Sequence, residues 1–501
     1  MSKPDASFPH EEDAVQRNSR QNFLAIFPSI VLPMFLAVVD QTIVATALPA
    51  IATSLGEVDR LSWVVVSYLV STTIAAPVYG RLGDVFGRRR LMFVALAIFM
   101  VASILCALST DIIMLTAARI LQGAGGGGLM TLSQALVGEA IPPRDRARYQ
   151  GYLATVAVTS SALGPVAGGF LTEHFGWQSV FLVNIPIGIG AVFMTMRLPD
   201  RTGTGEPFRF DTLGLIFFAA FIASTLIMLE EAQQLASGKF LAPVALAVLA
   251  LTAVVLLVRR EKRAPSPLLS IPLMKHPAIW RCDGLAACHG AALVALITFL
   301  PLYYRMVHGA TAAETGLLLL PMTIGIGVGS LTTGRIVGRT GQTAIYPSVG
   351  LALVSLGILG AAILSPELGA VTLSWSFGLI AVCMGTVMGV VQLTVQLASG
   401  REQLGAGAAT VQFSRSLGAA VGTALVGTVL FATMTHANPE AGQAFGRVLQ
   451  GGPQALDSLA AAQRAAITEG LDAAFRNAFL CIAGFACLAT GLAWTLPIRR
   501  I

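Results

Sequence analysis

The sequence has little charge for its length. Only 12% of its 501 residues are Asp, Glu, Lys or Arg, and 55% are hydrophobic, whereas soluble domains carry roughly 25% charge. The net charge of +6 comes mostly from cations in short loops, and no basic helix with interleaved aromatics is present, so a nucleic-acid partner is not expected. The composition instead predicts an all-α polytopic membrane protein with the lipid bilayer around it.

The sequence also lacks the usual marks of metal, disulfide and nucleotide chemistry. None of the six cysteines forms a C-x-x-C pair, so neither a zinc site nor a disulfide framework is indicated. No G-x-x-x-x-G-K-[S/T] loop occurs, which argues against ATP binding by this chain. Residues 1–22 are polar and mixed in charge and do not read as a cleavable signal. We therefore expect no metal and no cofactor.

The apolar segments predict fourteen membrane-spanning helices. Each run is about as long as a bilayer core requires. Their approximate bounds are 23–50, 61–80, 91–109, 112–137, 149–173, 179–197, 211–230, 241–258, 278–304, 314–335, 344–364, 371–398, 406–434 and 473–496. An even number puts both termini on one side, and most of the 32 Lys and Arg residues then fall on that same side. By the positive-inside rule, both termini are expected in the cytoplasm.

The loop Gly80–Arg90, GRLGDVFGRRR, lies between two apolar runs. A charged loop in this position must lie at a water face, and its arginines place that face in the cytoplasm. A stop-transfer charge cluster would account for the arginines but not for Asp84 or the glycines. Gly80, Asp84, Gly87, Arg88 and Arg89 are the candidate residues of this loop, which we expect to stabilise one conformation of the protein.

A partial copy of this loop indicates an internal repeat. Gly334–Gly341 repeats the glycine spacing of Gly80–Gly87 without the aspartate and the arginine run, and both segments follow an even-numbered run. A repeat at this distance implies two six-helix halves. The expected organisation is a cytoplasmic tail, a first half, an extra hairpin with linker, and a second half with a long outside loop at 435–472; the bounds are 1–22, 23–200, 201–277 and 278–501.

Asp40 lies deep in the first apolar run, in VVDQTIVATALPAI. An ionised carboxylate there costs at least about 2.5–3.5 kcal/mol unless it is partnered or hydrated. Such a group can exchange a proton with either side of the membrane. The alternative is a structural carboxylate that only holds a neighbouring helix.

Arg119 lies inside the fourth run, in LTAARILQGAGGGGLM. A guanidinium in the membrane needs a carboxylate, a carbonyl or water. Asp40 lies about 25 Å along a helix rising from the cytoplasm, and Arg119 about 11 Å along one descending from outside. Their shared depth predicts that they meet, with Arg119 as a carbonyl-capping structural residue as the alternative. The glycines after Arg119 are not a dinucleotide fingerprint because no strand precedes them.

Two further groups of residues are candidates. Gly164, Pro165, Gly168 and Gly169 lie in the fifth run, where the glycines offer a small-x-x-x-small face and the proline removes a backbone donor. Additional polar sites within the membrane are Asp283 and His289 in the ninth run and Gln412 and Arg415 in the thirteenth. A lone histidine is more often a satisfied interior group.

These motifs together resemble the major facilitator superfamily. The loop Gly80–Arg90 resembles its G-x-L-x-D-x-x-G-R-R/K loop. The segment around Asp40 resembles the L-D-x-T-I-V-N-x-A-L-P signature of the fourteen-helix drug:proton antiporters, the EmrB/QacA-type family. Arg119 and Gln122 match its R-x-x-Q-G-x-G motif, which is associated with proton coupling, and Gly164–Gly169 resembles its antiporter motif G-P-x-x-G-G.

A sixth-run segment carries the same resemblance. Trp177, Phe181, Asn184 and Pro186 match the family's W-R-W-I-F-x-I-N-x-P signature, and Gly405–Gly422 resembles its thirteenth-helix segment. The resemblance implies a major facilitator fold of two six-helix bundles plus two linker helices. It also implies export of small hydrophobic or amphiphilic compounds, including antibiotics, driven by inward proton flow across the bacterial inner membrane.

Two other functions stay open at this point. A permease driven by a separate ATPase would leave Asp40 unexplained. An exporter of one specific metabolite or lipid would use the same apolar walls as a multidrug exporter. A periplasmic adaptor is a further candidate partner, on which the sequence is silent.

Overall fold

The computed structural model describes residues 8–55, 61–199, 210–232, 241–264, 267–268, 270–437 and 461–500. Within these ranges every regular element is a helix, and the only β-type pairing is an isolated bridge between Gln342 and Arg500. The prediction of an all-α chain is confirmed for the described residues.

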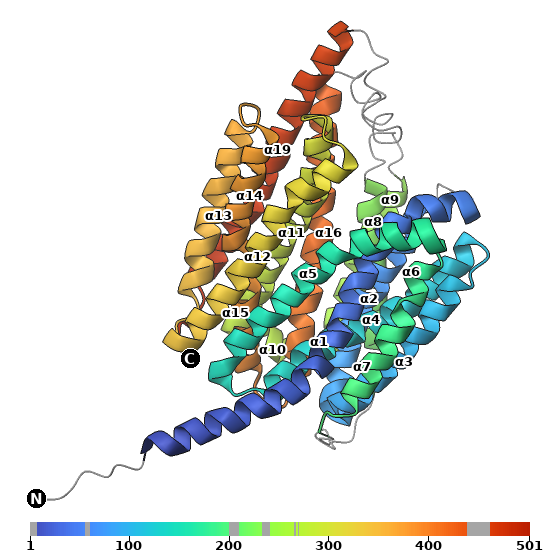
Figure 1. Ribbon diagram of the computed structural model, residues 1–501. Helices are drawn as coiled ribbons and strands as arrows, with labels where there is room; N and C mark the ends of the chain where they lie inside the picture. Colours follow the sequence, from blue (N-terminus) through green and yellow to red (C-terminus); the bar gives the residue numbers. More distant parts are fainter. Residues whose placement is uncertain are drawn as a thin grey trace, which may run out of the picture. The chain divides into compact units, whose positions relative to one another are not determined.

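The first compact unit contains Met1–Arg146, Ser160–Phe208 and Gly400–Ala408. Its helices are α1 (Phe8–Leu55), α2 (Leu61–Phe86), α3 (Arg88–Ala107), α4 (Ile112–Ala140), α6 (Ser179–Leu182), α7 (Asn184–Thr195) and most of α5 (Pro143–Phe175). Helix α4 packs against α1, α2 and α3, and α7 packs against α1 and α3 (Figure 1). Helix α4 is therefore central to this unit.

The second unit contains Ala147–Thr159, Arg209–Ser399 and Ala409–Ile501. Its helices are α8 (Thr212–Ala232), α9 (Leu241–Glu261), α10 (Ile271–Lys275), α11 (Pro277–Met306), α12 (Ala312–Thr340), α13 (Ile345–Leu364), α14 (Ala370–Met384), α15 (Val387–Ser399), α16 (Leu404–Ala437) and α19 (Ala461–Trp494). Helices α8 and α9 form a hairpin, α12 packs on α14, and α19 packs on α11 and α13. Both α5 and α16 contribute residues to both units.

Local sequence signals determine where these helices begin and end. The Asp111 side chain accepts a hydrogen bond from the Met114 amide at 2.8 Å and caps α4. Gly87 separates α2 from α3 with φ of 93°, and Gly341 ends α12 with φ of 68°, a conformation that glycine adopts without steric cost. These glycines hold matching positions in the two copies of the predicted repeat.

Among the described residues, twelve helices are long and apolar enough to cross a membrane, so the protein is a multi-pass membrane protein. They match twelve of the fourteen predicted runs, and the number fourteen is not confirmed. The other two predicted runs correspond to α4 and to the α6–α7 pair. Helix α4 has 29 residues but is less apolar because it holds Arg119, Gln122 and a run of glycines, whereas α6 and α7 are short.

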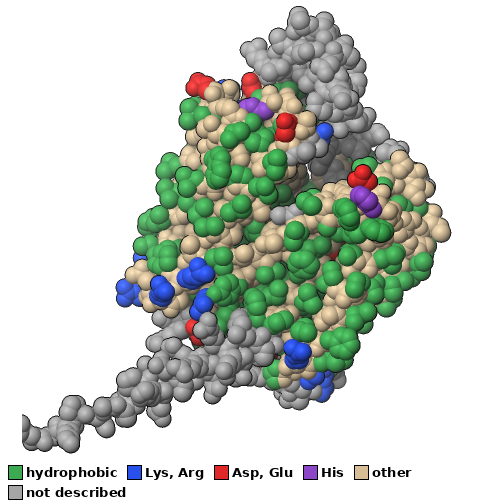
Figure 2. All heavy atoms as spheres, in the orientation of Figure 1, with side chains coloured by type: hydrophobic (Ala, Val, Ile, Leu, Met, Phe, Trp, Pro, Cys, Tyr) green, Lys and Arg blue, Asp and Glu red, His purple; other side chains and the backbone are tan. Residues whose placement is uncertain are grey.

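Hydrophobic side chains cover much of the visible surface, and Lys and Arg side chains lie near helix ends (Figure 2). Leu379 on α14, for example, is 72% exposed, and Leu241, Val248 and Leu251 of α9 are also exposed. Such a surface is unfavourable in water and suited to lipid contact.

Helices extend into two segments that were predicted to lie outside the spanning runs. Helix α1 already begins at Phe8, so most of the predicted tail 1–22 is helical. Helix α16 continues to Ala437 and α19 starts at Ala461, so helices enter both ends of the predicted loop 435–472. Residues 438–460 of that loop lie outside the described residues.

Candidate functional site

A buried ion pair joins α1 to α4 inside the first unit. Nη1 of Arg119 lies 2.6 Å from Oδ2 of Asp40. Asp40 is 0% exposed and Arg119 1% exposed. The shared depth of the two residues correctly predicted that they meet, and the pairing offsets the cost of burying each charge.

Neutral donors complete the coordination of the Asp40 carboxylate. Oδ1 accepts hydrogen bonds from Nε2 of Gln122 at 2.8 Å and from Nδ2 of Asn184 at 2.7 Å. Oε1 of Gln122 accepts from Nη1 of Arg119 at 2.6 Å. The Ser103 hydroxyl oxygen accepts from Nε2 of Gln122 at 2.8 Å. Helices α1, α3, α4 and α7 therefore meet in one polar network.

Arg119 also has partners on α2. Its Nε donates to the Val64 carbonyl at 3.2 Å, and its guanidinium carbon lies 4.1 Å from the centroid of the Tyr68 ring, a cation–π contact. The Tyr68 hydroxyl donates to the Ala37 carbonyl at 3.2 Å. The carbonyl contact considered as an alternative for Arg119 thus occurs together with the ion pair. Loss of the Asp40 charge would leave Arg119 partly held in place.

The glycines after Arg119 allow α4 to approach its neighbours closely. A Cβ on Gly123 would lie 2.5 Å from the Tyr68 carbonyl oxygen, and one on Gly127 would lie 2.4 Å from that of Thr72. No side chain larger than hydrogen fits at these distances. The glycine run therefore serves helix packing and places Arg119 against α2.

The segment predicted as the loop Gly80–Arg90 is helical except at Gly87, because residues 80–86 end α2 and Arg88 begins α3. Asp84 in this last part of α2 is 5% exposed and caps the start of α16. Its Oδ1 accepts from the Gly405 amide at 2.9 Å, and its Oδ2 accepts from the Ala406 amide at 3.0 Å. A carboxylate at a helix N-terminus is stabilised by these free amides and by the helix dipole. A Cβ on Gly405 would lie 2.3 Å from the Gly80 carbonyl oxygen, so this contact needs glycine.

The arginines of the loop have separate partners. Nη2 of Arg88 lies 2.5 Å from Oδ1 of Asp84, and its Nη1 pairs with Glu139 of α4. Nη2 of Arg89 donates to the Met196 carbonyl at 3.0 Å. Asp84 is therefore held both by a charge pair and by a helix N-terminus.

The motif Gly164–Gly169 divides into two faces of α5. A Cβ on Gly164 would lie 1.9 Å from the Thr42 hydroxyl oxygen, and one on Gly168 would lie 2.5 Å from the Ile43 carbonyl oxygen. Pro165 and Gly169 are exposed on the other side, and α5 continues unbroken through Pro165. Two of the four motif residues thus pack α5 onto α1, close to Asp40 in the chain.

The other four candidates lie in the second unit and do not join the Asp40 network. Nη2 of Arg415 donates to Oε1 of Gln412 at 3.2 Å. Asp283 and His289 are both buried on α11. Oδ1 of Asp283 and Nδ1 of His289 have no hydrogen-bond partner. Arg415 also lies near His289, whereas Asp283 stands apart with Thr410 as its partner.

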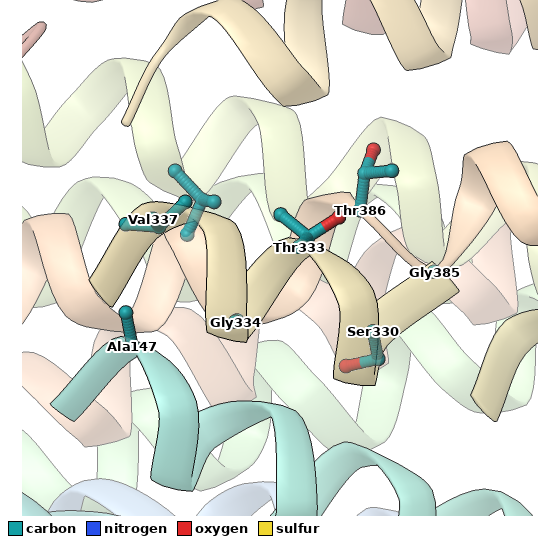
Figure 3. Close-up of a pocket in the computed structure, with 9 residues that line it drawn as sticks. Ala147, Ser330, Thr333, Gly334, Val337, Gly385 and Thr386 are labelled. Carbon is teal, nitrogen blue, oxygen red and sulfur yellow. The ribbon is translucent and has the colours of Figure 1, made fainter. Parts of the chain in front are cut away.

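A small cavity lies in the second unit where α14 ends and α15 begins. Ser330 and Thr333 of α12 line it, together with Gly385 and Thr386 of the helix break (Figure 3). Its volume of about 10 Å³ suits about one water molecule. It is much too small for a drug-sized compound.

Sequence reasoning did not find two members of the Asp40 network. Tyr68 and Ser103 are polar residues within apolar runs, and neither belongs to a quoted motif. Gln122 and Asn184 were recognised only as motif positions. The available signal was their shared depth with Asp40, which placement of every polar residue along its run would have revealed.

The helices and the site define a polytopic membrane protein with a charged network enclosed by one of its helix bundles. The family model described as Major Facilitator Superfamily matches residues 30–423, and the chain belongs to that family. It is accordingly a transporter and not an enzyme.

Curated relatives agree with this class. The chain is 34% identical over 405 residues to an uncharacterised MFS-type transporter, Rv1877, of Mycobacterium tuberculosis, a match covering 81% of this chain and 59% of that protein. It is 30% identical over 408 residues to the multidrug transporter protein MdtP of Bacillus subtilis, covering 81% and 75%. It is 34% identical over 340 residues to the efflux pump dotC of Dothistroma septosporum, covering 65% and 57%. The chain thus spans less than two thirds of some relatives.

Solved structures share the fold. The proton:xylose symporter XylE superposes with a TM-score of 0.62 at 14% identity, covering 96% of this chain and 97% of that one. The human organic anion transporter MFSD10 superposes with a TM-score of 0.59 at 14% identity, covering 95% and 99%. At this identity the likeness is one of fold.

Proposed function

We propose that the protein exports hydrophobic or amphiphilic compounds, including antibiotics, across the bacterial inner membrane in exchange for protons. The observation that carries the proposal is the fully buried Asp40–Arg119 pair at 2.6 Å. The names of the relatives MdtP, a multidrug transporter, and dotC, an efflux pump, favour export of such compounds.

The network gives a physical route to coupling. With Asp40 ionised, Arg119, Gln122 and Asn184 all donate hydrogen bonds to its carboxylate. Protonation of Asp40 removes the charge attraction to Arg119, and breaking one side of a buried pair costs about 3–5 kcal/mol. A free-energy change of this size is large enough to shift the balance between two conformations. The membrane potential contributes about 2.3 kcal/mol per charge per 100 mV.

The same proposal includes fourteen crossings with both termini in the cytoplasm. Helix α4, at 29 residues, is long enough to span about 30 Å, and the α6–α7 pair covers Ser179–Thr195. Together with the twelve apolar helices among the described residues, α4 and the α6–α7 pair would give the fourteen crossings of the EmrB/QacA-type family. In this topology the exposed apolar hairpin α8–α9 lies between the two halves of the sequence.

An efflux panel tests the function. Cells that lack other pumps would express the protein, and the retention of dyes and antibiotics would be compared with and without an uncoupler that collapses the proton gradient. We expect uncoupler-sensitive export of several apolar compounds. Export that is lost on ATP depletion while the proton gradient is maintained would contradict the proposal. Export of a single compound would favour a specific metabolite or lipid exporter.

A further inference from the structure

Asp283 is a buried carboxylate without a counter-charge. It lies on α11 in the second unit and is 8% exposed. Among the described residues, its Oδ1 has no hydrogen-bond partner, and the one side chain that hydrogen-bonds to the carboxyl group is the neutral Thr410 of α16. This differs from Asp40, whose two oxygens both accept hydrogen bonds and whose charge is balanced by Arg119.

The charged and titratable groups around Asp283 do not compensate it. On α11, Cys282 is adjacent to it, while Arg281 donates to the Pro277 carbonyl at 2.8 Å and lies over Trp280. On α16, Arg415 lies near His289 and Gln412. From α19, Leu492 packs beside the neighbouring Gly284, and α15, which also packs on α11, has no ionisable residue. An ionised Asp283 would therefore be an unpaired buried charge.

The size of the space selects the ligand. Helices α11 and α16 are in backbone contact here, since a Cβ on Gly418 would lie 2.1 Å from the Ala287 carbonyl oxygen and one on Gly422 would lie 2.5 Å from the Ala291 Cα. One carboxylate and one hydroxyl supply too few ligands for a metal ion. A proton on Oδ1 satisfies the carboxylate without requiring further room.

The repeat gives this position added meaning. Helices α1 and α11 are the first helices of the two halves, because the two copies of the repeat, which start at Gly80 and Gly334, lie at the end of the next helix, α2 and α12 respectively. Each half thus has one buried carboxylate on its first helix, one with a cationic partner and one without.

We infer that Asp283 is a second proton-binding site, and that it takes up and releases one proton in each transport cycle. The part of this inference that concerns the transport cycle rests on the proposed proton-coupled function, whereas proton binding by Asp283 does not. The proton comes from water, binds Oδ1 to give a neutral carboxylic acid, and returns to water when a conformational change hydrates that oxygen. Thr410 is a positioning residue that holds the carboxyl group.

Infrared difference spectroscopy on the purified full-length protein tests proton binding without any substrate. In the wild-type protein, raising the pH should remove a carboxylic-acid carbonyl band. This band should be absent in Asp283→Asn, shifted in frequency in Asp283→Glu and altered in Thr410→Val. Glu367→Gln, which changes an exposed turn residue, should leave the band unchanged. The inference would be overturned if the band persisted in Asp283→Asn. It would also be overturned if the only titrating band were one that Asp40→Asn removes.

Transport in proteoliposomes, with ethidium as the probe, tests whether Asp283 takes up and releases a proton in each cycle. The number of protons moved per ethidium should fall by one in Asp283→Asn and be unchanged in Glu367→Gln. An unchanged number in Asp283→Asn overturns a coupled role. If the wild-type protein moves no ethidium against its gradient in response to a proton gradient, the proposed function fails for this probe, and the infrared band still decides whether Asp283 binds a proton.

Discussion

Asp84 and Gly405 are 321 positions apart in the chain, and Oδ1 of Asp84 accepts a hydrogen bond from the Gly405 amide at 2.9 Å. The same carboxylate pairs with Arg88. Asp84 therefore connects the end of α2 with the first turn of α16. In a transporter that alternates between two conformations, a contact of this kind can stabilise one of them.

Asp84→Asn is expected to weaken that conformation. The amide keeps the size of the side chain but loses the charge that attracts Arg88 and the α16 amides, each worth roughly 0.3–2 kcal/mol at a helix end. Cysteine accessibility from the two sides of the membrane should shift, and transport should slow while substrate binding remains. Asp145→Asn, an exposed acid in the first turn of α5, is the matched control. Unchanged accessibility would show that Asp84 does not stabilise one conformation over the other.

Asp40→Asn is expected to abolish gradient-driven efflux because the amide cannot ionise. The variant should still reach the membrane, since Asn retains an acceptor for Gln122 or Asn184. Asp111→Asn makes the same chemical change at an exposed helix cap, where Asn caps as well as Asp, and should export normally. Efflux in everted vesicles measures both variants. Full proton-driven export by Asp40→Asn would mean that the carboxylate is only structural.

Asp40 and Arg119 should be strongly coupled in stability. Removing either charge leaves the other buried and alone, which costs about 3–5 kcal/mol. The double variant Asp40→Asn with Arg119→Gln has no unpaired charge and should be more stable than the sum of the single effects by about 0.5–3 kcal/mol. Unfolding in detergent gives the four values of the cycle. Additive losses would argue that the two residues act independently.

Gly164→Ala and Gly169→Ala should differ although both residues belong to one motif. The new methyl group at Gly164 would lie 1.9 Å from the Thr42 hydroxyl oxygen, whereas nothing lies within 4 Å of a Cβ at Gly169. We expect Gly164→Ala to destabilise the protein by about 1–3 kcal/mol through overpacking, and Gly169→Ala to be neutral or slightly stabilising. Thermal unfolding and efflux should rank the variants in this order. Equal losses would point to a role of the motif outside helix packing.

The helices were largely predictable because membrane segments are read from length and hydropathy. The pairing of Asp40 with Arg119 followed from depth, since both residues had to find a partner in an apolar setting. Tyr68 and Ser103 were missed because only the charged residues were compared by depth. The Ser103 hydroxyl also has a local partner, the Phe99 carbonyl of its own helix at 2.8 Å, whereas the Tyr68 hydroxyl needs a carbonyl of another helix, that of Ala37.

Other features depended on tertiary packing. Helices α14 and α15 form one apolar run in the sequence, and no proline lies at the break at Gly385–Thr386 to predict it. The unpartnered Oδ1 of Asp283 is likewise a property of how α11 and α16 pack. Sequence periodicity identifies the helices that meet but not the atoms left without a partner.

The position of Gly405 in the first unit has a consequence for biosynthesis. At about 5–20 residues per second, the first turn of α16 is synthesised roughly 15–60 s after Asp84. Until then the ribosome has inserted most of that unit, but Asp84 has only Arg88 and solvent as partners. Completion of the amino-terminal bundle must wait until nearly the whole polypeptide has been translated, so a chain truncated before residue 404 should remain a target for membrane proteases.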